Sequence, residues 1–172
     1  MKTKVLIALI AMVVAVACDK PNEAKQKSKH EQAVENIVAQ CQNFDHTTFA
    51  QELPGMWRLD TDVCYDGNWE KITDWCLVVG QYNNDCIGWC GSTYTFTADG
   101  KGSRSPWYYY PGEDETPQVF DWHYDAENNK LVFSGGWKPK TVSGFNGEYL
   151  VFDYYDTTNK KNVRNIYKRQ AE

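Results

Sequence analysis

The sequence predicts an all-β protein in which eight short antiparallel strands form a barrel or a sandwich behind a short N-terminal helix. From Trp57 onwards, apolar and polar residues alternate with the period of strands, and Gly, Asn and Asp residues separate the runs. No apolar pattern of helical length interrupts them, which excludes parallel βαβ units. Alternation with one polar face favours strands that close around an interior, where eight strands leave room for side chains or one small ligand.

The chain opens with an export signal. Lys2 and Lys4 precede an apolar run over residues 5–17, which ends at Cys18. The run is too short to span a bilayer, which needs roughly 20 apolar residues. Its end resembles the lipobox of bacterial lipoproteins, in which the cysteine thiol is diacylated and becomes the mature N-terminus. We therefore expect a signal peptide over residues 1–17 and a lipid anchor on Cys18; the alternative is an ordinary secretory signal with Cys18 as a bystander.

The charge of the chain limits its partners. The formal net charge is -5 at pH 7, and no basic cluster lies on the part expected to fold. This argues against nucleic acid, whose phosphates must be neutralised. Contact with the membrane is therefore expected through the lipid, and more than one acyl chain is needed for stable anchoring.

The six cysteines fit an exported protein, because disulfides persist in oxidising compartments. A lipidated Cys18 leaves an odd number, and Cys41 is the favoured unpaired residue because the others lie in one dense segment. The disulfide candidates are Cys64, Cys76, Cys86 and Cys90. A zinc site on the last two of these is the alternative, but a second close pair and a nearby histidine are missing from the sequence.

A helical lead-in is expected between the anchor and the strands. Residues 18–30 are rich in Lys, Gln and Glu and indicate a flexible, lipidated tether. In the lead-in over residues 31–53, a helix to Cys41 is predicted by one stripe of residues at helical spacing: Val34, Ile37, Val38 and Cys41. Thr48 and Gln51 have capping-box spacing, which predicts a further helical turn before Pro54.

The strands are expected within a barrel domain over residues 54–172. Their predicted ranges are 57–65, 69–79, 92–97, 104–110, 118–125, 130–134, 148–155 and 162–169. In the first strand the alternation predicts one shared face for four residues: Trp57, Leu59, Val63 and Tyr65. Asp99-Gly100 is a strong hairpin signal between the third and fourth strands.

The ends of this pattern resemble a known family. Gly55-x-Trp57 opens the first strand and Arg169 closes the last. Three further segments carry the likeness: 94–102, 120–124 and 167–169. The chain resembles the lipocalins and, more closely, the short lipocalin-like lipoproteins of the Bacteroidetes type. The resemblance implies an eight-stranded up-and-down barrel, closed where Trp57 packs against Arg169. It also implies anchoring in the outer membrane, on its periplasmic or surface face.

By the same resemblance, the barrel would bind a small, largely apolar ligand without a cofactor. Apolar surface would be buried in a preformed cavity, and tyrosine hydroxyls would orient the ligand. The interior candidates, one alternating face of each strand, are Leu59, Tyr94, Phe96, Phe120, Trp122, Tyr124, Phe133, Tyr149 and Val151. If these side chains fill the barrel completely, the protein would instead be a ligand-free structural subunit of an envelope complex.

A second binding surface is indicated by the densest aromatic cluster. It consists of Trp107, Tyr108, Tyr109 and Tyr110. At a barrel mouth such rings stack on sugars or contact a partner, which predicts a surface module for glycans or host protein. The alternative is a loop packed against the core.

Metal binding and catalysis have little support. Asp121, His123 and Asp125 would share one strand face, where their ligand types suit a divalent cation. Because aromatic residues occupy the opposite face, we interpret the three as the solvent face. A nucleophile elbow, a zinc-protease motif and a phosphate-binding loop are also missing from the sequence, so we expect neither a metal nor an enzyme.

Overall fold

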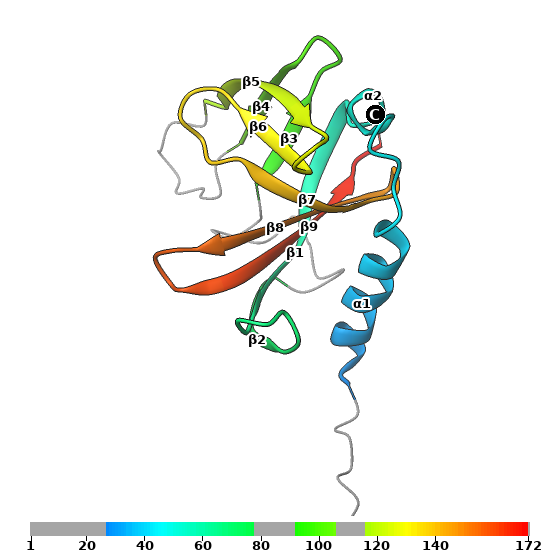
Figure 1. Cartoon of the computed structure of the whole chain (residues 1–172), viewed down its shortest axis with the longest axis vertical. Helices are drawn as coiled ribbons and strands as arrows, with labels where there is room; N and C mark the ends of the chain where they lie inside the picture. Colours follow the sequence, from blue (N-terminus) through cyan, green and yellow to red (C-terminus); the bar gives the residue numbers. More distant parts are fainter. Residues whose placement is uncertain (1–26, 78–91, 106–115, 172) are drawn as a thin grey trace, which may run out of the picture.

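The computed structural model describes residues 27–77, 92–105 and 116–171, which form a β-barrel with α1 along its outer wall (Figure 1). The elements in chain order are α1 (Lys29–Cys41), α2 (Phe49–Glu52), β1 (Gly55–Tyr65), β2 (Ile72–Leu77), β3 (Thr93–Phe96), β4 (Lys101–Arg104), β5 (Gln118–Asp125), β6 (Lys130–Phe133), β7 (Lys140–Phe145), β8 (Tyr149–Asp156) and β9 (Lys161–Arg169).

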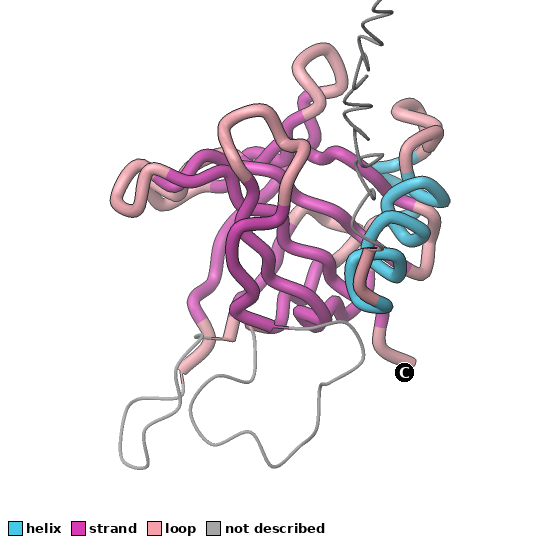
Figure 2. The backbone as a smooth tube through the Cα atoms, turned by 90° about the horizontal axis from the view of Figure 1, so that it is seen from below, coloured by secondary structure: helices cyan, strands magenta, loops and turns pink. Residues whose placement is uncertain are grey.

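Eight of the strands close into a ring. The order runs β1-β3-β4-β5-β6-β7-β8-β9, every pairing is antiparallel, and β9 returns to pair with β1. Figure 2 shows the strands surrounding a common interior, with the helices on one side. β2 pairs only with the second half of β1, from Asp62 to Tyr65, and stays outside the ring. The predicted eight-stranded antiparallel up-and-down barrel is confirmed.

The strands that make up the eight differ from the prediction. β7 was not predicted, because its alternation is obscured by Pro139 at its start and Gly144 within it. A Cβ on Gly144 would lie 2.7 Å from Cβ of Cys41 in α1, so the lack of a side chain at Gly144 lets the helix pack closely against β7. The predicted second strand is the short β2, and β4 begins directly after the Asp99-Gly100 turn. The rest of the predicted fourth strand, residues 106–110, lies outside the described residues.

The predicted helix before the barrel is confirmed. It begins earlier than expected, because Ser28 forms a capping box with Glu31, and this shortens the expected tether. The buried residues of its stripe are Val34, Ile37 and Cys41. In the described part of the chain, no helix is long and apolar enough to cross a membrane.

The short helix α2 also lies where a turn was expected, but the expected capping box is wrong. Thr48 is the N-cap residue with a helical backbone, and its side chain makes no capping hydrogen bond. The hydroxyl of Thr48 instead donates to the carbonyl oxygen of Asp45 at 3.5 Å. Phe49, the first residue of the helix, is fully buried, so packing holds the turn in place.

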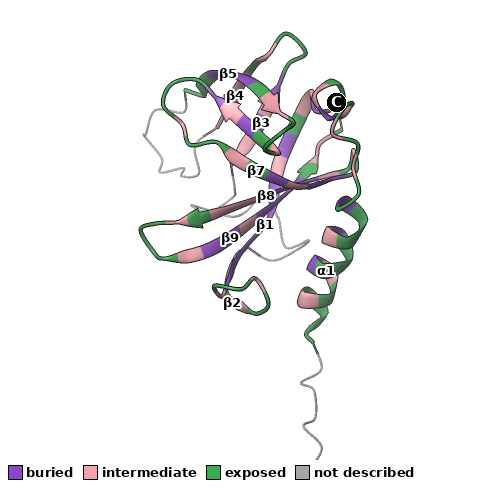
Figure 3. Cartoon of the chain, viewed as in Figure 1, coloured by how far each residue is buried: buried purple, intermediate pink, exposed green. Residues whose placement is uncertain are grey.

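The barrel has two apolar cores, one inside it and one beneath α1 (Figure 3). An irregularity in the pairing of β1 with β9, between Leu59 and Thr61, switches the faces of β1. Beyond this irregularity, Asp62 is on the interior face of β1, and Val63 and Tyr65 are on its outer face. The predicted single face for Trp57, Leu59, Val63 and Tyr65 is therefore wrong, because the bulge shifts the alternation by one residue.

Candidate functional site

One end of the barrel, which we call the Trp57 end, is shut by an arginine stacked on a tryptophan. Cζ of Arg169 lies 4.2 Å from the centroid of the Trp57 ring. Its guanidinium donates to three carbonyl oxygens, those of Glu52, Pro54 and Gly147. These bonds join β9 to the segment after α2 and to the β7–β8 turn. The arginine thus fastens three parts of the chain across this end.

The glycine two residues before Trp57 makes room for this arginine. Gly55 has φ +136°, and a Cβ there would lie 2.6 Å from Nη1 of Arg169. The indole Nε1 of Trp57 donates to the carbonyl oxygen of Leu53 at 2.8 Å, which orients the buried ring. Each residue of the Gly55-x-Trp57 motif that the sequence singled out therefore has a contact at the closed end.

Aromatic rings fill the barrel from this end inwards. The Phe49 ring lies 4.5 Å from that of Tyr124 and 5.0 Å from that of Phe145. Deeper inside, the Tyr94 ring contacts five others, with centroids 5.3 to 6.2 Å away: Phe96, Phe120, Phe133, Phe152 and Tyr167. The Trp57 end is thus closed by packed rings.

Most predicted interior residues lie inside the barrel. Six are buried in the interior core: Leu59, Tyr94, Phe96, Phe120, Trp122 and Phe133. Tyr124 is partly buried against it and accepts or donates a hydrogen bond of 2.6 Å with Nδ1 of His46.

The two candidates on β8 face outwards, which corrects the prediction. Tyr149 and Val151 pack beneath α1, whereas Leu150 and Phe152 occupy the interior. Both faces of this strand are apolar because the helix covers the outer one. The sequence pattern therefore could not tell the two faces apart.

The opposite end, which we call the Lys140 end, places charged side chains within the barrel wall. Lys140 begins β7, two residues before Val142 of the interior core. Arg104 ends β4 opposite Tyr94, and its Cζ lies 5.6 Å from the centroid of that ring. Asp62 of β1 is 5% exposed and lies opposite the buried Asn165 of β9. Three charges thus meet where the prediction placed only apolar groups.

These charged groups perturb one another. Burial raises the pKa of Asp62 to about 6, and nearby Lys140 and a hydrogen bond from Asn165 oppose that rise. Burial lowers the pKa of Lys140 to about 8; Arg104 lowers it further and Asp62 opposes the change. Titratable groups with such shifts are concentrated at functional sites.

The same region holds the hydroxyls of Tyr94, Tyr154 and Tyr167. Tyr167 shares a hydrogen bond of 3.0 Å with Ser92. Burial raises the pKa of Tyr154, and Asp62 adds to the effect. Tyr94 is fully buried, and its hydroxyl has no hydrogen-bond partner among the described residues. A buried hydroxyl without a partner is uncommon and costs stability.

The sequence analysis missed Asp62, Arg104 and Lys140. Asp62 was not placed on the predicted face of Trp57 and Leu59, since the bulge in β1 leaves no mark in the alternation. Lys140 belongs to the strand that was not predicted. Arg104 was placed at the start of a predicted strand over residues 104–110, whereas it is the last residue of β4. The usable signal was the spacing of Lys140 and Val142, which share one face of a strand.

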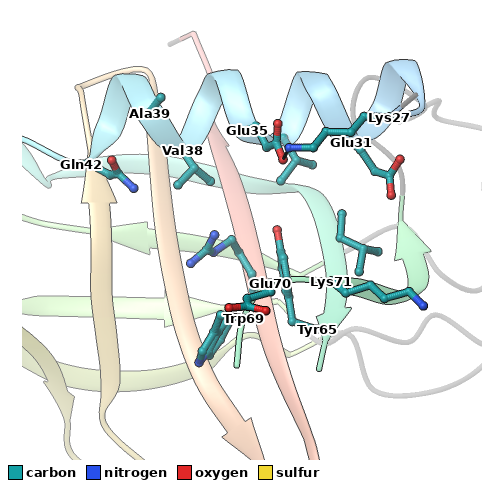
Figure 4. A pocket seen from close by; sticks show the side chains of 13 residues that line it. Lys27, Glu31, Glu35, Val38, Ala39, Gln42, Tyr65, Trp69, Glu70 and Lys71 are labelled. Atoms are coloured by element: carbon teal, nitrogen blue, oxygen red, sulfur yellow. Dashed lines mark hydrogen bonds and ion pairs between the residues drawn. The ribbon is translucent and has the colours of Figure 1, made fainter. Parts of the chain in front are cut away.

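A groove of about 260 Å³ lies outside the barrel, between α1 and the residues around the β1–β2 turn (Figure 4). In the close-up, the Tyr65 side chain points towards the helix across it. Cζ of Arg164 lies 5.2 Å from the centroid of each of the Tyr65 and Trp69 rings, and its guanidinium donates twice to Asp153. The aromatic surface of the groove is therefore covered by the Arg164 guanidinium, which is already paired with the Asp153 carboxylate.

The trio Asp121, His123 and Asp125 lies on the outer side of β5. Asp121 pairs with Lys101, and Asp125 accepts hydrogen bonds from Asn128 in the β5–β6 turn. In the described ranges, no group of three His, Cys, Asp or Glu side chains is arranged to hold a metal ion. The two aspartates thus have structural partners.

Several predicted residues lie outside the described part of the chain. They are Cys18, Cys86, Cys90 and the aromatic cluster at residues 107–110, and the side chain of Cys76 is not described either. No disulfide joins Cys41 and Cys64, the two cysteines with described side chains. Burial, reinforced by Glu148, raises the pKa of the Cys41 thiol to about 11, so this thiol is poorly reactive.

Comparison with known proteins does not assign the chain to a family. No protein-family model matches the sequence, and no curated protein matches it. The geometry of the two barrel ends therefore carries the functional argument.

Proposed function

We propose that this protein is a lipid-anchored envelope protein whose barrel binds a small, largely apolar ligand at the Lys140 end. The observation that best supports this proposal is the difference between the two ends of the closed barrel. Aromatic rings and Arg169 shut the Trp57 end, while charged and hydroxyl groups gather inside the other. Ligand sites of this kind combine a mostly apolar wall with a few polar groups that fix orientation.

The proposed anchor rests on the N-terminal sequence. An apolar run followed by Cys18 supports lipidation, and the acidic chain offers no basic surface for membrane binding. α1 begins at Lys29, so residues 18–28 connect the anchor to the barrel. Fully extended, this tether would reach roughly 35 Å from the membrane surface.

Replacement of the lipidation residue tests the anchor. Cys18→Ser should move the protein from the membrane fraction to the soluble fraction, whereas the control Cys41→Ser should leave it with the membrane. Mass spectrometry of the mature N-terminus should find the diacyl modification in the control only. If the Cys18→Ser protein stays with the membrane, the anchor proposal is wrong.

Native mass spectrometry tests ligand binding. Protein extracted gently from its membrane should carry a small molecule that is present in native spectra and lost on denaturation. A parallel titration with the neutral probe N-phenyl-1-naphthylamine should show saturable fluorescence. If neither a bound molecule nor probe binding is found, the carrier function fails and a ligand-free structural subunit becomes the better account.

A further inference from the structure

We infer that the Lys140 end binds the anionic group of its ligand, held by the Lys140 ammonium and the Tyr94 hydroxyl beside Arg104. The inference rests on the proposed function and names the ligand class within it. The ligand would be an amphipathic anion, with an apolar body and one carboxylate, sulfonate or phosphate group. The shared chemistry is a negatively charged oxygen group at the end of an apolar molecule.

The first step is the position of Lys140. Nζ lies 4.1 Å from the centroid of the Tyr154 ring and 6.0 Å from that of Phe152, an interior core residue. The ammonium is thus held against aromatic faces within the barrel wall. Over the part of the chain that the structure describes, no carboxylate lies within ion-pair distance of Nζ.

The second step is the lack of a close counter-ion for the Lys140 ammonium. Arg104 reaches the same region, since Cζ lies 5.6 Å from the centroid of the Tyr94 ring and 5.5 Å from that of Trp137. Among the described residues that act on Lys140, the counter-charge is Asp62, whose carboxylate lies beyond ion-pair distance of Nζ. Its carboxylate already accepts a hydrogen bond of 2.9 Å from Asn165. An ammonium between low-dielectric walls, without a described carboxylate at ion-pair distance, attracts an anion.

The third step is the Tyr94 hydroxyl. It is buried without a hydrogen-bond partner, although its neighbour Tyr167 has one in Ser92. Such a group loses its hydration on folding and regains a bond only if something else supplies the acceptor. An anionic oxygen is a strong acceptor for a hydroxyl, so one ligand group would satisfy both Tyr94 and Lys140.

The fourth step explains why the ligand would also be apolar. The charged groups lie next to aromatic rings, and one of these rings, Tyr94, packs on Phe133 and Phe152. Trp137 extends this surface, with its ring 5.3 Å from Phe120 and 6.0 Å from Phe133. Tyr94, Phe120, Phe133 and Phe152 are already buried, whereas Trp137 is only partly buried. An amphipathic anion would bury its body against the exposed part of Trp137, which a fully polar anion would leave in water.

A matched pair of fluorescent probes tests the inference. The anionic probe is 1-anilinonaphthalene-8-sulfonate and the neutral one is N-phenyl-1-naphthylamine, which share the aromatic body. Both are titrated at pH 7 into the full chain carrying Cys18→Ser. We expect the anionic probe to bind about 10-fold more tightly, which is the effect of a single charge-assisted contact.

Variants assign that preference to the named groups. Lys140→Met should remove the preference, while neutral-probe affinity stays within about twofold; Lys140→Arg should keep it. Tyr94→Phe keeps the ring and should weaken only the anionic probe, by about 3- to 10-fold. The control Lys130→Met removes an exposed lysine from the start of β6 and should change neither affinity. Circular dichroism and thermal melting verify that each variant folds.

The outcomes separate the inference from the proposed function. If the neutral probe binds and the anionic probe has no preference, or if Lys140→Met weakens both probes equally, the anion site is wrong and ligand binding stands. If neither probe binds the parent protein, ligand binding itself fails.

Discussion

The two ends of this barrel are built from opposite kinds of interaction. At the Trp57 end, large rings contact one another, and Arg169 has three carbonyl partners and an aromatic face. At the Lys140 end, Lys140 has no carboxylate within ion-pair distance and the buried Tyr94 hydroxyl has no hydrogen-bond partner, in both cases among the described residues. The first arrangement stabilises the fold. The second costs stability, which is the usual mark of a site kept for binding.

The largest expected effect comes from removing the central ring of the Trp57 end. Trp57→Ala should lower the free energy of unfolding by about 4 kcal/mol, since a fully buried indole is lost and a cavity remains. Trp137→Ala, at the partly exposed Lys140 end, should cost about 1–2 kcal/mol. Urea unfolding of both variants measures the difference. Equal losses would contradict the contrast between the ends.

Next in size is the loss of the arginine that fastens the Trp57 end. Arg169→Gln removes the stacking on Trp57 and leaves three carbonyl oxygens without this donor, so about 2–3 kcal/mol should be lost. The adjacent, exposed Lys168→Gln should change stability by less than about 0.5 kcal/mol. Chemical unfolding of the pair measures both values. A small effect of Arg169→Gln would show that the end is held by ring packing alone.

At the Lys140 end, removal of charge should have the opposite sign. The double variant Asp62→Asn with Lys140→Met should be more stable at pH 7 by about 1–3 kcal/mol, because two desolvated charges are replaced by neutral groups. The same changes in the exposed pair Lys101 and Asp121 should move stability by less than about 0.5 kcal/mol. A loss of stability in the buried double variant would mean that these charges stabilise the barrel.

The smallest expected effect is a dip in stability with pH. The raised pKa of Asp62 favours folding at low pH, and this contribution is lost as the pH rises through about 6. The lowered pKa of Lys140 favours folding above its ordinary value of 10.5, and this contribution is lost as the pH falls through about 8. Stability should therefore be lower by about 1–2 kcal/mol between these values.

Melting temperatures measured from pH 4 to 10 test this dip, and the Asp62→Asn, Lys140→Met variant should lack it. The other groups that face the pair are Arg104, Tyr94, Tyr154 and Tyr167, and burial raises the pKa values of the tyrosines. They stay protonated over the range that matters, so the dip would belong to Asp62 and Lys140. A dip that persists in the double variant has another origin.

The class of fold could be predicted from the sequence because alternation and turn residues are local signals. α1 was equally accessible, since its stripe repeats at helical spacing over about two turns. β7 was hidden by Pro139 and by Gly144, whose role depends on a contact with Cys41 far away in the chain. The outward side of Tyr149 and Val151 was hidden for a similar reason, because α1 buries the outer face of β8 and the barrel interior buries the other.

The candidate site depended almost wholly on tertiary structure. The sequence by itself predicted the strand-rich domain and the aromatic content of its core, and the resemblance implied the packing of Trp57 against Arg169; the export signal stays a prediction. Only the folded barrel brought Asp62, Arg104 and Lys140 together, since they lie on separate strands and one bulge in β1 turns Asp62 towards the interior side. Local spacing specifies which strands form, but the face that a charge occupies depends on register and on what covers the outside of the barrel.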